Sequence, residues 1–84
     1  MKNKVLIKVI VPSLNEEYEV FIPVNERITK VKELLAKSIN DISDSSFDTN
    51  KIYSLIDPDM GTIYDSRLSV RETNIINSKK VVLL

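Results

Sequence analysis

The side chains that could support chemistry in this chain are carboxylates gathered in two acidic stretches. The first is Asp57-Pro58-Asp59-Met60-Gly61, followed by Asp65. Its spacing is superficially that of a calcium-binding loop, but an EF-hand loop also needs a third oxygen ligand before the glycine and a glutamate at its end. Neither is present. The stretch therefore predicts a structural turn, in which Gly61, the only glycine of the chain, takes a positive φ angle.

The second acidic stretch, residues 41–50, is rich in serine and aspartate. Blocks of like charge are usually solvated, so an exposed loop is a better interpretation than a weak cation site. Ser45 and Ser46 have no histidine in the chain to activate them as nucleophiles. Phe47 is expected to anchor this loop to the core. The aspartates of the loop are Asp41, Asp44 and Asp48.

The absence of two residue types limits the chemistry further. Without histidine, the usual general base near neutral pH and the commonest zinc ligand are missing. Without cysteine, the chain has no thiol nucleophile, redox pair or disulfide framework, which agrees with a cytoplasmic protein. Neither stretch predicts the buried, paired carboxylates of acid–base catalysis. We therefore expect a protein that is not an enzyme and that needs no cofactor or metal.

Charge gives no strong pull toward one class of partner. Twelve lysines and arginines balance twelve aspartates and glutamates. A neutral balance does not favour nucleic acid or anionic lipid. Scattered lysines without interleaved aromatic residues predict a solvated face rather than a nucleic-acid surface. These lysines are Lys30, Lys37, Lys79 and Lys80.

Length and hydropathy indicate one folded domain over residues 1–84. With 43% apolar and 29% charged residues, the composition is that of a globular chain. The longest apolar runs, such as Val81-Val82-Leu83-Leu84, are far shorter than the ~20 residues that a membrane-spanning helix requires. The basic start, Met1-Lys2-Asn3-Lys4, is not followed by a signal peptide, because Lys8 interrupts the apolar stretch. Direct membrane insertion is not expected.

Two strands are predicted at the start of the chain. Residues 4–11 form a β-branched run in which Lys8 marks the wetter face. A turn-rich break over 12–17 separates this run from a second strand over 18–24. Strands joined this closely form an antiparallel hairpin.

After the hairpin, the apolar period changes to that of a helix. One apolar stripe has spacings of three and four residues, and lysines and a glutamate fall away from it. Asn25 is a candidate for the helix cap. The stripe consists of Ile28, Val31, Leu35, Ile39 and Ile42.

The rest of the chain predicts short elements. They are a third strand over 52–56, a short fourth strand over 62–64, a helical turn within 68–75 and a final strand over 79–84. The final strand has no following partner, so it is expected to insert beside an earlier one. A helix across one face of a mixed sheet of four to five strands is an α+β architecture.

This element order resembles the β-grasp fold of ubiquitin from about Tyr18 to Leu84. The helix start Ile28-Thr29-Lys30-Val31-Lys32-Glu33-Leu34-Leu35 is similar to that of ubiquitin. So is Leu68-Ser69-Val70-Arg71-Glu72-Thr73-Asn74-Ile75, which resembles the segment before the last strand of ubiquitin. Arg27 stands where ubiquitin has a capping threonine.

The departures from ubiquitin bear on function. Conjugating and sulfur-carrier members of the fold end in a flexible diglycine tail, whereas this sequence ends at Leu84 and has a single glycine. The resemblance therefore implies a non-conjugating member. Among bacterial proteins without this tail, the chain is similar to the YukD/EsaB family, which is encoded with the type VII (WXG100) secretion machinery of Gram-positive bacteria. Ser78 stands where a turn glycine is common in that family.

Strand alternation divides the apolar residues between two faces of the sheet. The set expected under the helix is Val5, Ile7, Val9, Tyr18, Val20, Ile22, Leu55, Val81 and Leu83. The set left on the opposite face is Leu6, Ile10, Phe21, Ile56, Val82 and Leu84. Exposed apolar residues mark an interaction site when they are contiguous, although scattered ones are ordinary on any surface. By alignment with ubiquitin, Ile56 falls at its central surface isoleucine and Leu84 at its patch valine, so these six are the predicted protein-binding residues.

The functional expectation that follows is a ubiquitin-like protein-binding module, an accessory or regulatory factor of type VII secretion with a component of that system as its partner. The alternative is a small self-associating structural protein of an unrelated pathway. In that case, residues 81–84 lie at a sheet edge or pack face to face in a homodimer.

Overall fold

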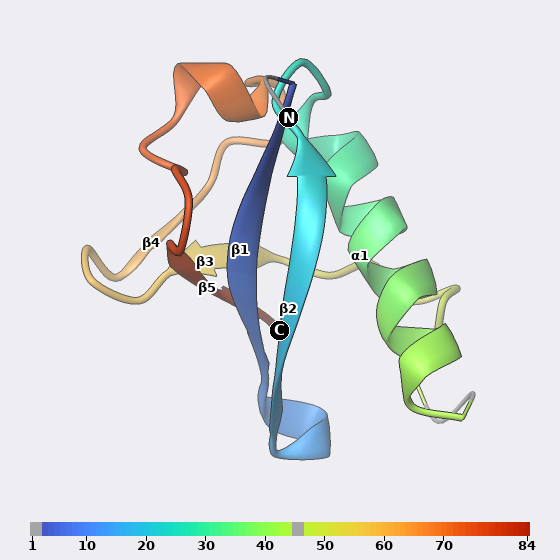
Figure 1. Cartoon of the computed structure of the whole chain (residues 1–84). Helices are drawn as coiled ribbons and strands as arrows, with labels where there is room; N and C mark the ends of the chain where they lie inside the picture. Colours follow the sequence, from blue (N-terminus) through green and yellow to red (C-terminus); the bar gives the residue numbers. More distant parts are fainter. Residues whose placement is uncertain (1–2, 45–46) are drawn as a thin grey trace.

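The computed structural model describes residues 3–44 and 47–84, and Ser45 and Ser46 lie outside them. Five strands form one mixed sheet in the order β2-β1-β5-β3-β4, and helix α1 lies across one face of it (Figure 1). β1 pairs with β2 antiparallel and with β5 parallel, and β3 pairs antiparallel with both β5 and β4. The elements are β1 (Lys4–Val11), the 3-10 turn η1 (Pro12–Leu14), β2 (Glu16–Pro23), α1 (Ile28–Ile42), β3 (Leu55–Asp57), β4 (Thr62–Ile63), the 3-10 turn η2 (Val70–Glu72) and β5 (Lys80–Leu83).

This arrangement confirms the expected α+β, ubiquitin-like architecture. The core lies between α1 and the inner face of the sheet. Most residues expected under the helix are buried, and Val5, Tyr18 and Val20 are partly buried against the same core. Phe47 is buried as expected and stacks on Tyr53, with 4.6 Å between the ring centroids. In the described part of the chain, no helix is long and apolar enough to cross a membrane.

Helix α1 differs from the prediction at both ends. Asn25 does not cap it: Arg27 is the N-cap residue and makes no side-chain cap hydrogen bond. Instead, backbone carbonyls of a distant segment accept from the first turn, Ile28 N donating to Leu68 O at 2.8 Å. At the other end, Ile42 is 56% exposed, so its place in the buried stripe was wrong. The structure closes the core there with Phe47, whose carbonyl accepts from Asn40 Nδ2.

The third strand begins three residues later than predicted. Residues 52–54 precede β3, and Ile52 is 90% exposed. The reason is that Tyr53 turns toward the helix side, where it stacks on Phe47 and donates a hydrogen bond to Asp48 O at 2.6 Å. Only Ser54 reaches the sheet, through two backbone hydrogen bonds with Leu84.

The position of β5 corrects the alternative of edge-to-edge self-association through residues 81–84. β5 lies between β1 and β3, in the middle of the sheet. Its backbone groups are therefore engaged on both sides and cannot template a further strand. The edges of the sheet are β2, with eight residues, and β4, with two.

Candidate protein-binding face

The outer face of the sheet carries an apolar row that crosses four strands. Ile10 on β1 is opposite Val82 on β5, Val82 is opposite Ile56 on β3, and Ile56 is opposite Ile63 on β4. Side chains directly opposite each other on neighbouring strands lie about 5 Å apart, so these four are in reach of one another. We call Ile10, Val82, Ile56 and Ile63 the outer row. The first three are half-buried and Ile63 is 67% exposed.

Leu84 extends the outer row along β5. It lies two residues beyond Val82, on the same face by strand alternation, and it is exposed. Its backbone N–H and C=O both pair with Ser54, which holds this end of the chain against the sheet. Four of the six predicted residues therefore lie in one contiguous region: Ile10, Ile56, Val82 and Leu84.

The other two predicted residues belong to a separate group. Leu6 and Phe21 lie directly opposite each other on β1 and β2. Between them and the outer row runs a charged row in which Lys8 is opposite both Glu19 and Lys80. The expectation of one patch of six residues is thus corrected to an outer row with Leu84 and a Leu6–Phe21 pair, because the registers of β1 with β2 and β5 place charges between them.

Ile63 is the member of the outer row that the sequence prediction omitted. Its strand was expected, but its face depends on the register of the β3–β4 hairpin. That register follows from the Asp57–Gly61 turn, where Gly61 has φ +67° and its N–H donates to Asp57 O at 2.8 Å. Counting outward from this turn would have placed Ile63 opposite Ile56.

A polar cluster around Asp57 fixes the strands that carry the outer row. Asp57 is 1% exposed. Its Oδ1 accepts from Lys79 Nζ at 2.9 Å, and its Oδ2 accepts from Asn74 Nδ2 at 2.7 Å. Lys79 Nζ also donates to Asp59 Oδ2 at 2.7 Å, and Tyr64 Oη donates to Asn74 Oδ1 at 2.7 Å. These contacts tie the β3–β4 turn to the segment that leads into β5. We call these five residues the Asp57 cluster.

Electrostatics keep the Asp57 cluster in one charge state near neutral pH. The hydrogen bond from Lys79, followed by that from Asn74, holds the pKa of Asp57 well below its usual range. The hydrogen bonds to Asp57 and Asp59 raise the pKa of Lys79. Burial, then the charge of Asp57, raises the pKa of Tyr64 to about 12. None of these three groups changes charge near pH 7, so the cluster is suited to hold the turn rather than to transfer protons.

The carboxylates of the turn are thus engaged with cationic and amide donors. Asp65, the last acidic residue of this stretch, pairs with Arg67, Nη2 to Oδ2 at 2.9 Å, which lowers the pKa of Asp65 to about 2. Within residues 3–44 and 47–84, no three acidic side chains gather as a metal site would require. The arrangement is that of the predicted structural turn.

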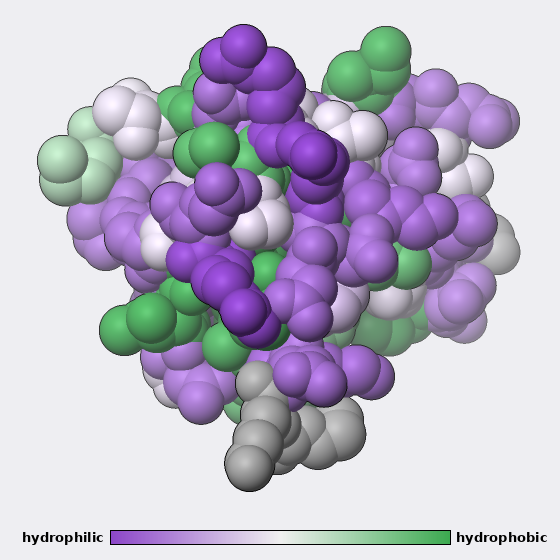
Figure 2. All heavy atoms as spheres, turned by 90° about the horizontal axis from the view of Figure 1, so that it is seen from above, coloured by the Kyte–Doolittle hydropathy of each residue, from purple (hydrophilic) through white to green (hydrophobic). Residues whose placement is uncertain are grey.

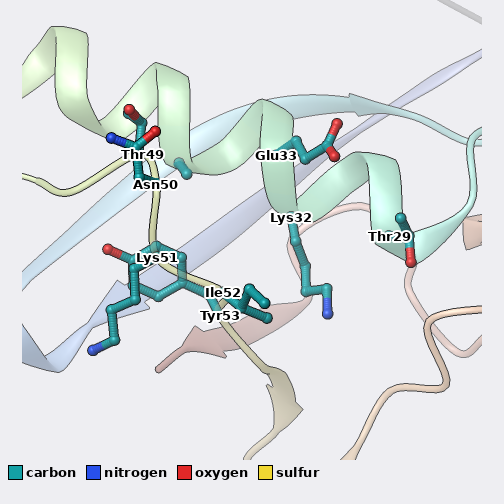
Figure 3. A pocket seen from close by; sticks show the side chains of 9 residues that line it. Thr29, Lys32, Glu33, Thr49, Asn50, Lys51, Ile52 and Tyr53 are labelled. Carbon is teal, nitrogen blue, oxygen red and sulfur yellow. The ribbon is translucent and has the colours of Figure 1, made fainter.

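A cleft that the sequence did not predict lies on the other side of the molecule, between α1 and residues 49–53 (Figure 3). It has a volume of about 320 Å³ and is lined by Lys32, Glu33 and Ala36 from the helix and by the loop through Tyr53. Lys32 Nζ donates to Ser66 Oγ at 3.1 Å, so this cation already has a partner. The exposed Ile52 also lines this cleft.

The end of the molecule that carries η2 has a different surface. Figure 2 views this end and shows mainly hydrophilic side chains, with apolar side chains in separate small groups. Contiguous apolar rows are therefore not a general property of this surface, which gives weight to the outer row as a distinct feature.

Comparison with known proteins supports the fold. No family model matches the chain, and no curated protein matches it. The ubiquitin-like domain of EccD5 from Mycobacterium xenopi is similar in structure, with a TM-score of 0.77, 15% identity, and coverage of 96% of this chain and 92% of that one. A chain of an ESX-5 inner membrane complex matches with a TM-score of 0.71 at 10% identity, covering 98% of this chain and 21% of that one.

A third similar structure belongs to a different biochemical setting. A chain of a toluene 4-monooxygenase complex matches with a TM-score of 0.76 at 8% identity, covering 95% of both chains. Identities this low establish only a shared fold. The chain therefore has the ubiquitin-like fold, and its function has to be argued from its own surface.

Proposed function

We propose that this chain is a ubiquitin-like protein-binding module that binds its partner through the outer row. The observation that carries the proposal is the register itself, because Ile10, Val82, Ile56 and Ile63 are consecutive cross-strand neighbours on the face that α1 leaves uncovered. Such a row gives a partner a continuous apolar surface on a rigid support. The Asp57 cluster holds that support at the β3–β4 turn.

The proposed setting is a type VII secretion system of a Gram-positive bacterium, in which the chain is a cytoplasmic accessory or regulatory factor without enzymatic activity. Two observations support this setting. The sequence resembles the YukD/EsaB family, and the fold is similar to the ubiquitin-like domain of EccD5 and to a chain of an ESX-5 inner membrane complex. The proposed partner is a protein component of that machinery.

The test is binding of the purified chain to purified soluble domains of the type VII membrane complex from the same cell. The Ile56→Ala/Val82→Ala variant should bind at least about tenfold more weakly, because central apolar anchors dominate interface energies. Ile52→Ala is the matched control, since Ile52 is exposed and lies beside α1 rather than on the outer face. It should bind as the wild type does.

The possible outcomes separate the parts of the proposal. Equal binding by the folded double variant would contradict the outer row as the interface. Absence of binding to every domain of the complex would contradict the secretion setting. Sedimentation equilibrium on the wild type tests face-to-face self-association: a dimer that the double variant abolishes would favour the structural alternative over partner binding.

A further inference from the structure

The free edge of β2 is the longest stretch of unpaired strand among the residues that the structure describes. β2 is an outermost strand of eight residues, while β4 at the opposite side has two. Figure 1 shows β2 between β1 and α1, with no strand beyond it. An exposed edge of this length is a template for another strand unless something blocks it.

The register shows which backbone groups point to this edge. Val24 N donates to Asn3 O at 2.9 Å, and these residues continue the β1–β2 pairing by one step. Hydrogen-bonded and non-hydrogen-bonded pairs alternate along antiparallel strands. Glu17, Glu19 and Phe21 therefore belong to the non-hydrogen-bonded pairs with β1, and they direct their N–H and C=O groups outward. No hydrogen bond within the described residues engages these N–H groups.

Pro23 fits this alternation of pairs, and it ends the part of β2 that could pair with another strand. It also belongs to a non-hydrogen-bonded pair, with Lys4, so its missing N–H lies on the outward side and costs the sheet nothing. The usable edge therefore extends over residues 16–22.

The charge of β2 decides between two occupants of the edge. Glu16, Glu17 and Glu19 are exposed, and β2 contains no lysine or arginine. Glu17 has one long, solvent-exposed ion pair, Oε1 to Lys80 Nζ at 3.8 Å, so its carboxylate is still accessible to a further cation. Pairing with a second copy of β2 would bring these glutamates of both copies close together, and like charges across a strand pair are destabilising. A strand with lysine or arginine at alternate positions would instead place positive charges opposite Glu17 and Glu19.

The surface beside the edge defines the other side chains of such a strand. On the outer face, Phe21 is exposed and would contact an apolar or aromatic residue. On the inner face, Tyr18 and Val20 are half-buried. The flank of α1 that faces away from the cleft carries the half-buried Leu34 and Ser38, which lie about 100° or more around the helix from the cleft residues. Apolar residues at the intervening positions would cover this inner surface.

We propose that the edge of β2 is a second docking site, which takes an extended segment of another protein, with alternating basic and apolar residues, as an added strand. Main-chain hydrogen bonds to Glu17, Glu19 and Phe21 supply affinity, and the glutamate side chains supply the preference for basic residues. This site is separate from the outer row and does not depend on it.

The test uses a short fluorescein-labelled peptide in which lysine and valine alternate, with fluorescence anisotropy at low salt. Glu19→Pro removes an outward N–H that the sheet does not use and places a ring across the edge. It should weaken binding at least about tenfold, since it removes both a donor and room for the added strand. Glu19→Lys should weaken binding about threefold to tenfold by charge alone. A peptide with glutamate in place of lysine should not bind.

The control is the Ile56→Ala/Val82→Ala variant, which should bind the peptide as the wild type does, so that failure of the outer row and failure of the edge are distinguishable. Unchanged peptide binding by a folded Glu19→Pro variant would overturn the proposal. If that variant does not fold, amide hydrogen exchange on the wild type decides. Protection by the peptide at Glu17, Glu19 and Phe21 supports the edge, and protection confined to other residues, or none, overturns it.

Discussion

The two faces of the same sheet have opposite characters, although the strands that form them alternate in the same way. On the inner face, Ile7, Val9 and Val81 have no exposed surface and are packed beneath α1. On the outer face, their sequence neighbours Ile10 and Val82 remain half-exposed, with no element above them among the described residues. Burial beneath the helix stabilises the fold, whereas the outer side chains are left available to a partner.

The Asp57 cluster joins these two regions. Leu55 of β3 points into the core, Ile56 points outward, and Asp57 points inward again to Lys79 and Asn74. A buried charge is tolerated because its partners satisfy it. The cluster therefore lets one short strand contribute to the core and to the outer row. Substitutions on the two faces should accordingly differ in how much they lower the stability of the fold.

The largest effect is expected in the core. Leu35→Ala should lower the free energy of unfolding by about 2–5 kcal/mol, because it removes a fully buried side chain and leaves a cavity. Urea denaturation followed by circular dichroism measures this change. The control is Ile56→Ala on the outer face, which should cost less than about 1.5 kcal/mol because Ile56 is only half-buried. Equal losses for the two variants would contradict the division between a buried inner face and a half-exposed outer face.

The next effect concerns the Asp57 cluster. Asp57→Asn should lower the melting temperature by more than about 10 °C at pH 7, because Lys79 then loses its buried counter-charge. Asp59→Asn is the matched control: Asp59 contacts the same ammonium but is exposed, so the expected decrease is less than about 5 °C. Differential scanning calorimetry measures both. A similar decrease in both variants would mean that burial of Asp57 adds nothing.

The stability difference between the wild type and the Asp57→Asn variant should depend on pH. The pKa of Asp57 is lowered in the folded state, so its contribution to stability is complete above the unfolded value of about 4 and is lost as the pH falls further. The pKa of Lys79 is raised, so its contribution persists until the pH exceeds the unfolded value of about 10.4. The difference in melting temperature between wild type and Asp57→Asn should therefore be constant between about pH 5 and 9 and should shrink below pH 4. A constant difference down to pH 2.5 would contradict this.

Much of the fold could be predicted from periodicity. The bounds of β1 were correct because a largely β-branched run interrupted only by Lys8 leaves little choice, and four of the five stripe positions of α1 are buried. The errors share one cause, contact with residues distant in sequence. Leu68 O replaces a side-chain cap at the start of α1, and the stack of Tyr53 on Phe47 delays β3.

The candidate site was predictable in its residue types and face but not in its extent. Alternation alone places Ile10, Ile56 and Val82 outward. Lys8 separates Leu6 from Ile10 already by alternation along β1, but the position of Phe21 opposite Leu6 and of Val82 opposite Ile10 depends on strand registers that no local pattern encodes. The ion pair of Asp57 with Lys79, 22 residues apart, was invisible for the same reason.

The smallest expected effects concern the turns that set the register of the outer row. Ser78 precedes β5 with φ +70°, a left-handed conformation that costs a non-glycine residue about 1 kcal/mol. Ser78→Gly should therefore raise the free energy of unfolding by up to about 1 kcal/mol, reduced by the greater freedom of glycine in the unfolded chain. Gly61→Ala is the reciprocal change at φ +67°. It should destabilise by about 1 kcal/mol through backbone strain alone, because an added Cβ meets no atom within 4 Å.

Chemical denaturation of both variants, with partner binding measured in parallel, separates an effect of the turns on stability from an effect on the outer row. If the turns act only through stability, both variants should retain wild-type affinity at the outer row. Loss of affinity in a fully folded Gly61→Ala variant would show instead that this turn positions Ile63 against Ile56, which makes the turn part of the binding surface. A stability gain from Gly61→Ala would contradict the assignment of strain to the positive φ angle.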